Sequence, residues 1–69
     1  MSVYKIVELV GTSTTSWEDA AKTAIEGAKK SLRHLRVAEV SELDVTLTDQ
    51  GDIELYRVKV KLSLKHESS

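Results

Sequence analysis

The sequence predicts a single α+β domain over residues 1–69, with element order β-α-β-β and a three-stranded antiparallel sheet wrapped around one helix. Three observations predict this fold. A short run of β-branched and aromatic residues opens the chain, one amphipathic stretch follows, and two long stretches of alternating polarity end it. A chain of 69 residues buries too little surface for more than one small domain, so these elements must share one core.

The first strand is expected at residues 3–10, "VYKIVELV", which are rich in β-branched side chains and end at a glycine. The hydroxyl-rich "GTSTTS" that follows supplies a turn and a helix cap. Thr15 with Glu18 fits a capping box, in which each side chain bonds the backbone N–H of the other residue. Ser16 with Asp19 is nearly equivalent, so the sequence leaves both starts open.

The helix is expected to run to about Leu35, because apolar residues recur at the spacing of one helical face. This stripe comprises Trp17, Ala21, Ala24, Ile25, Ala28, Leu32 and Leu35. We expect Trp17 to close the end of the core and His34 to complement the macrodipole at the helix C-terminus. Gly27 costs about 1 kcal/mol relative to alanine inside a helix. A close approach by the sheet or by a neighbouring subunit would explain it, and so would drift.

Two long strands are expected at about residues 36–48 and 53–65, joined by "TDQGD", where Gly51 can take the positive φ of a short turn. The apolar residues of the first of these strands change parity halfway, which predicts a bulge near residues 41–42. The two sets are Ala38 and Val40, then Leu43, Val45 and Leu47. The last strand alternates cleanly, with Tyr56, Val58, Val60, Leu62 and Leu64 on one face.

One helix cannot cover strands of this length, because a dozen strand residues span about 40 Å and about 18 helical residues span only about 27 Å. Apolar residues on the overhang and on the sheet face away from the helix are therefore expected to be uncovered in one copy. They are Val37, Leu43, Val45, Leu47, Ile53 and Leu55. Uncovered apolar strands mark interfaces, so the sequence predicts a multimer of identical copies.

Composition excludes several classes of function. The net charge of −1 argues against a nucleic-acid binder. No apolar run reaches the ~20 residues of a membrane span, and the N-terminus lacks a signal peptide, so a cytoplasmic protein without a membrane partner is expected. The chain has no cysteine and two histidines, which disfavours disulfides and a closed zinc site. No nucleophile–base pair is recognisable, so we do not expect an enzyme.

Acidic residues dominate the stretch between Val37 and Tyr56, where the sequence has no lysine or arginine. Basic residues follow at Arg57, Lys59, Lys61 and Lys65. Cross-strand pairing of acids with bases is the main expectation. The alternative is a hard-cation site built when symmetry copies bring carboxylates together. Its tentative ligands are Asp44, Asp49, Asp52 and Glu54.

The whole chain resembles the dodecin family. The resemblance covers residues 2–67 and is found in "VYKIVELVGTS", "SWEDAA", "LRHLRVAEV" and "YRVKVKLSLKHE". It implies a hollow homododecamer with 23 symmetry that stores or buffers flavins without turnover. In flavin-binding dodecins a tryptophan two residues before a Glu-Val stacks on the flavin ring, and a glutamine after the last-strand tyrosine bonds its polar edge.

Those two family positions are Val37 and Arg57 in this sequence, and the Arg-Gly that commonly follows in the middle strand has no counterpart in "SELDV". Glu39 belongs to the same family site and is expected to pair with Arg57 across the strands. The resemblance is greater to a branch without the tryptophan, which includes a calcium-binding member. We therefore expect a non-enzymatic storage shell with weak or lost flavin binding and possible calcium binding. The alternative is a working store of FMN or riboflavin despite these substitutions.

Overall fold

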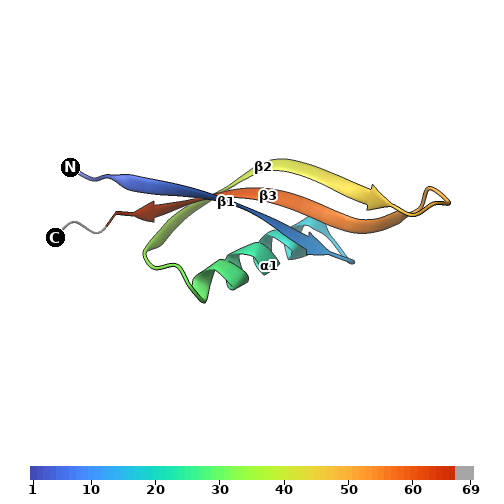
Figure 1. The fold of residues 1–69 in the computed structure, drawn as a ribbon, viewed down its shortest axis with the longest axis horizontal. Coiled ribbons are helices and arrows are strands. Elements are labelled where there is room, and N and C mark those ends of the chain that lie inside the picture. The colour runs from blue at the N-terminus through green and yellow to red at the C-terminus, as the bar shows by residue number, and fades with distance from the viewer. Residues whose placement is uncertain (67–69) are drawn as a thin grey trace.

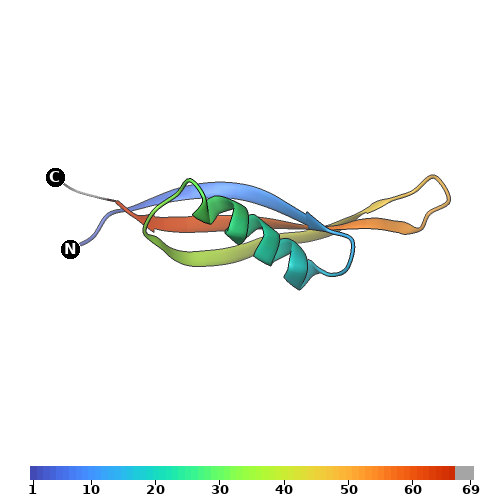
Figure 2. The same ribbon diagram turned by 90° about the horizontal axis from the view of Figure 1, so that it is seen from below.

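The computed structural model of the protein describes residues 1–66 (Figure 1). Its elements are β1 (Tyr4–Ser13), α1 (Trp17–Lys29), β2 (Leu35–Leu47) and β3 (Ile53–Lys65). Both β1 and β2 pair antiparallel with β3, which gives the sheet order β1-β3-β2. The helix α1 lies against one face of this sheet (Figures 1 and 2). The β-α-β-β fold predicted from the sequence is confirmed.

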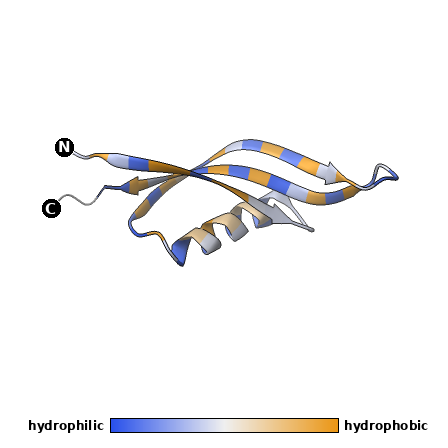
Figure 3. Cartoon of the chain, viewed as in Figure 1, coloured by the Kyte–Doolittle hydropathy of each residue, from blue (hydrophilic) through white to orange (hydrophobic). Residues whose placement is uncertain are grey.

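The core lies between α1 and the central strand. Small side chains on α1 face larger branched side chains on β3, which lets the helix approach the sheet closely. The cluster of buried residues comprises Ala20, Ala24 and Ala28 of α1 with Val58, Val60 and Leu62 of β3. Leu64 extends the buried row of β3, at 8% exposure. The alternation of apolar and polar residues predicted for this strand is visible along β3 in Figure 3, and the apolar residues from Val58 to Leu64 are the buried ones.

The first strand is longer than residues 3–10, because Gly11 does not end it. Gly11 lies opposite Val58 in the β1–β3 ladder, and β1 continues to Ser13. A Cβ atom at Gly11 would overlap the Ala20 carbonyl oxygen and lie 2.9 Å from the Ala24 Cβ. This glycine therefore serves a close approach of β1 to α1 rather than a turn.

The helix begins with the second of the two caps. Ser16 is the N-cap, and its hydroxyl accepts a hydrogen bond from the Asp19 N–H at 3.0 Å. The helix ends at Lys29, not near Leu35, so the predicted C-terminus was wrong. Its last turn tightens, because the Ser31 and Leu32 N–H groups both donate to the Ala28 carbonyl. Leu32 still packs on the core from the loop that follows.

The predicted bulge in β2 is confirmed, with a register shift between Val40 and Glu42. Before it, Val40 lies opposite Val60, and after it Leu43 lies opposite Val58. Residues paired in an antiparallel ladder share a face, so the extra residue brings both apolar sets to the side of α1. Leu43 is nevertheless 55% exposed, as expected for a residue on the part of the strand that the helix does not cover.

The two long strands extend beyond α1 as a hairpin whose tip lies at the opposite end of the molecule from the start of β1 and the end of β3 (Figure 1). The molecule is elongated, with extents of 54 × 20 × 15 Å. Gly51 takes the expected positive φ, 88°, in the hairpin turn. Large apolar residues exposed in β2 and β3 are Val37, Val40, Leu43, Leu47 and Ile53. The described part of the chain contains no helix long and apolar enough to cross a membrane.

Candidate functional site

The sheet face turned away from α1, called the outer face below, holds most of the candidate ligand-binding residues. On β3 it is formed by the residues that alternate with the buried row, from Arg57 to Lys65. Their partners on β1 and β2 complete it, and all of the β1 partners, Tyr4 to Thr12, are exposed. The candidate residues on this face are Val37, Glu39, Asp44 and Arg57.

Ion pairs cross the outer face between neighbouring strands. Arg57 bonds Asp44 with two nitrogens, Nε to Oδ1 at 2.7 Å and Nη2 to Oδ2 at 2.9 Å. Lys59 Nζ lies 2.9 Å from Glu42 Oε1. Lys61 Nζ lies 4.0 Å from Glu8 Oε1. The predicted cross-strand pairing of acids with bases is confirmed for Asp44 and Glu42.

These pairs shift the protonation of their members. The hydrogen bond from Arg57, with its positive charge, holds the pKa of Asp44 below the ordinary value of 3.8. Asp44 in turn raises the pKa of the Arg57 guanidinium. The bond to Glu42, with added attraction from Glu8, raises the pKa of Lys59 above 10.5. Asp44 therefore stays ionised to lower pH, and Arg57 and Lys59 stay charged to higher pH, than the free side chains would.

Asp44 also connects the outer face to the helix side of the sheet. Its carbonyl oxygen accepts a hydrogen bond from the Trp17 indole Nε1 at 3.0 Å. The Trp17 ring meets Tyr56 edge to face, with centroids 5.2 Å apart. Trp17 remains 38% exposed and is not among the described residues that pack on the buried cluster, so its expected role in closing the core is not confirmed. The hydrogen bond from the indole joins the first turn of α1 to the backbone of β2 at Asp44.

The positions that correspond to the flavin site lie apart within one chain. Val37 is 56% exposed and lies opposite Ser63 on β3. Arg57 is six residues from Ser63 along β3, which separates the two by about 20 Å at ~3.3 Å per residue. Glu39 lies opposite Lys61 rather than Arg57, so the expected Glu39–Arg57 pair was wrong. The one-residue shift of the bulge moves Asp44 into the place opposite Arg57.

The tentative cation ligands lie along the hairpin. Both Asp44 oxygens accept bonds from Arg57, and Glu54 Oε1 accepts a bond from the Thr46 hydroxyl at 3.2 Å. Asp49 and Asp52 are exposed in the turn, which is closed by the Thr48 N–H bond to the Asp52 carbonyl. Within residues 1–66 no three histidine or acidic residues of one chain gather closely enough to hold a metal ion.

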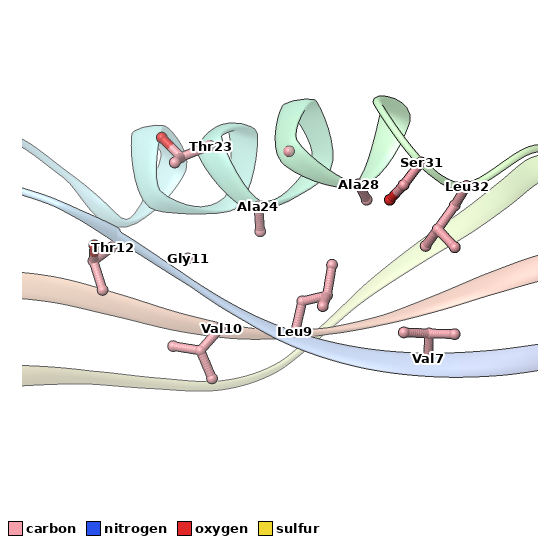
Figure 4. Close-up of a pocket in the computed structure, with 11 residues that line it drawn as sticks. Val7, Leu9, Val10, Gly11, Thr12, Thr23, Ala24, Ala28, Ser31 and Leu32 are labelled. Atoms are coloured by element: carbon pink, nitrogen blue, oxygen red, sulfur yellow. The ribbon is translucent and has the colours of Figure 1, made fainter.

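A hollow that was not predicted from the sequence lies between β1 and α1. It has a volume of about 480 Å³, and its lining includes Leu9, Gly11, Ala24 and Leu32 (Figure 4). Gly27 also borders it, and a Cβ atom there would meet nothing within 4 Å. Gly27 was the available signal, since it has no side chain to fill the space beside β1.

The fold, its long uncovered hairpin and its outer face identify the class of protein. The chain belongs to the dodecin family, whose family model matches residues 3–67. Assembly as homododecamers is known for this family.

Among its relatives is the calcium dodecin of Mycobacterium tuberculosis, which is 46% identical over 65 residues, covering 94% of this chain and 90% of the relative. The crystal structure of that calcium-chelating antigen, described as having a novel calcium-binding site, matches with a TM-score of 0.83 over 99% of this chain and 96% of the other. The dodecin of Thermus thermophilus is 40% identical over 67 residues, covering 97% of this chain and 96% of the relative. The dodecin from Streptomyces coelicolor is 31% identical, with a TM-score of 0.90 over 99% of this chain and 96% of the other.

Proposed function

We propose that the protein is a non-enzymatic, cytoplasmic storage shell of the dodecin type, built from twelve copies, that binds calcium and has weak or no affinity for flavin. The proposed loss of flavin affinity is inferred from one observation, the residues that occupy the two family contact positions. Val37 offers no aromatic ring. The guanidinium of Arg57 is engaged by both oxygens of Asp44.

Both substitutions weaken a flavin contact. An aromatic ring stacked on a planar ligand contributes about 0.5–1.5 kcal/mol beyond the area that it buries. Valine lacks that term and covers less of a ring face. An arginine has only donors, so it can bond flavin carbonyls but not the flavin ring N–H. To reach a ligand, Arg57 must also leave a charge-assisted, two-bond contact with Asp44.

A flavin titration tests the first half of the proposal. Riboflavin or FMN added to the assembled protein should keep its fluorescence, because no ring stacks on it. The matched variant Val37→Trp should bind flavin roughly 2- to 10-fold more tightly than the natural chain, since it restores the stacking partner. Strong quenching by the natural chain at low micromolar concentration would instead favour the alternative, a working flavin store.

Two observations support the calcium half of the proposal. A relative 46% identical over nearly the whole chain is named a calcium dodecin. The hairpin of this chain places Asp49 and Asp52 in an exposed turn, where their side chains make no ion pair within residues 1–66. Calcium takes six to eight oxygen ligands, so carboxylates from more than one copy must converge. We propose Asp49, Asp52 and Glu54 as the main ligands, with Asp44 restricted by Arg57.

Calorimetry with calcium tests this half. We expect heat of binding in the natural protein and roughly tenfold weaker binding for Asp52→Asn, which removes one charged ligand. Glu18→Gln is the matched control, because Glu18 is an exposed acid on α1, away from the hairpin. No heat and no thermal shift at millimolar calcium would remove the calcium role, whatever the flavin result.

A further inference from the structure

The part of the hairpin formed by residues 45–55, called the arm below, projects beyond the end of the sheet at which α1 begins (Figure 1). The two strands of the arm are paired with each other. Val45 lies opposite Tyr56 at its base, and Leu47 lies opposite Ile53 near its tip. Within residues 1–66 no hydrogen bond or ion pair joins the arm to α1. The arm is thus ordered within itself, and its direction is set at its base.

The base of the arm lies where β2 bends. A register shift between Val40 and Glu42 comes just before the base, and a second shift separates Thr46 from Leu47. A bulge leaves one residue unpaired and bends the strand that contains it. β2 is also an edge strand, because the sheet order is β1-β3-β2. The sheet therefore supports this bent part of β2 from one side only.

Trp17 joins α1 to the base of the arm. Its indole Nε1 donates to the Asp44 carbonyl at 3.0 Å, and its ring meets the Tyr56 ring edge to face with centroids 5.2 Å apart. One side chain thus contacts both strands of the hairpin at the point where the arm begins. The hydrogen bond is made to the main chain of Asp44, so it is separate from the bonds between the Asp44 carboxylate and Arg57.

The first turn of α1, which carries Trp17, is itself held to the end of β1. Ser13 is buried, and its hydroxyl donates to Asp19 Oδ2 at 2.7 Å. The same hydroxyl oxygen accepts the Thr15 N–H at 3.0 Å. Ser16 then caps the helix by accepting the Asp19 N–H. The first turn is therefore a fixed support from which the indole reaches β2.

We propose that Trp17 fixes the direction of the arm relative to the rest of the chain, so that loss of its hydrogen bond lets the arm move about its base. A hinge movement needs a few residues that absorb the change in backbone angles, and the bulge of β2 supplies them. Leu47 and Ile53 on the arm are each more than half exposed. The direction of the arm decides where these apolar side chains are presented to other copies. The inference does not depend on calcium or flavin binding, because every contact in it lies within one chain.

Hydrogen exchange of the assembled protein, measured by mass spectrometry of peptic fragments, tests the proposal with Trp17→Phe. Phenylalanine keeps a ring beside Tyr56 but has no N–H to donate. We expect fragments from residues 45–55 to exchange roughly 2- to 10-fold faster than in the natural chain, as for the loss of one hydrogen bond. Fragments from residues 58–64 should exchange at the natural rate. Glu18→Gln, which changes an exposed neighbour in the same turn, should leave both regions unchanged.

Mass measurement and circular dichroism must first show that each variant is folded and assembled like the natural chain. Tyr56→Leu removes the ring beside the indole and leaves the indole N–H, so it should accelerate exchange of the arm to a smaller extent. It replaces Trp17→Phe as the test if that variant does not assemble. Unchanged exchange of the arm would overturn the proposal. So would an equal acceleration in residues 58–64, because Trp17 would then contribute only to overall stability.

Discussion

Asp44 connects Arg57 on the outer face with Trp17 at the start of α1. Its carboxylate takes both bonds of Arg57, and its carbonyl holds the Trp17 indole. Arg57, at one of the two candidate flavin positions, is therefore oriented by Asp44. No periodicity in the sequence singles out Asp44 as its partner. The sequence predicted that acids and bases would pair across the hairpin. It assigned the wrong acid to Arg57, because Glu39 lies before the bulge, opposite Lys61, and the extra residue of the bulge places Asp44 opposite Arg57.

Stability at acid pH should depend on Asp44. Because Arg57 lowers its pKa in the folded state, the pair stabilises the protein above pH 3.8, and this contribution is lost as the pH falls through the lower folded value. In Asp44→Asn the melting temperature should therefore fall less steeply between pH 5 and pH 2 than in the natural chain. The effect should be small, since both side chains are about half exposed. Parallel melting curves for Asp44→Asn and the natural chain, with Glu18→Gln as control, would contradict the assignment.

At the scale of elements, the close contact between α1 and β1 depends on Gly11, which has no side chain. Gly11 passes under the helix where a Cβ atom would meet Ala20 and Ala24. Because the first strand continues through this residue, a glycine that looked like a strand end is a packing position. The bulge in β2 is the second feature at this scale. Its Ser41 hydroxyl donates to the Lys59 carbonyl at 3.2 Å, which fixes the shift in register.

The two glycines that border this helix should respond in opposite ways to alanine. Gly11→Ala should lower the free energy of unfolding by about 1–3 kcal/mol, since the added carbon overlaps backbone that cannot move freely. Gly27→Ala should raise it by about 0.5–1 kcal/mol, because alanine favours the helix and nothing lies within 4 Å of the new atom. Urea unfolding at fixed protein concentration measures both. A destabilising Gly27→Ala would show that another copy occupies the space beside α1.

At the scale of the whole molecule, one copy leaves much of its hairpin uncovered. The helix covers the inner part of the sheet, while Val40, Leu43 and Leu47 of β2 remain at least half exposed. Contiguous apolar surface of this kind is typical of interfaces.

The mass in solution should be about twelve times the 7.7 kDa of one chain. Leu43→Asp should dissociate this assembly, because it places a charge on an apolar surface that other copies cover. Light scattering or native mass spectrometry measures both, and Lys22→Gln should remain assembled. A natural chain that runs as a monomer at micromolar concentration would contradict the shell, and with it a calcium site shared between copies.

The sequence by itself determined the order of elements, the strand bounds to within a residue for β2 and β3, and the bulge. These follow from local rules of polarity and spacing, which a single sequence displays fully. Only the tertiary structure decided the role of Gly11, the end of α1 at Lys29 and the partner of Arg57. Each depends on which segments distant in sequence come into contact.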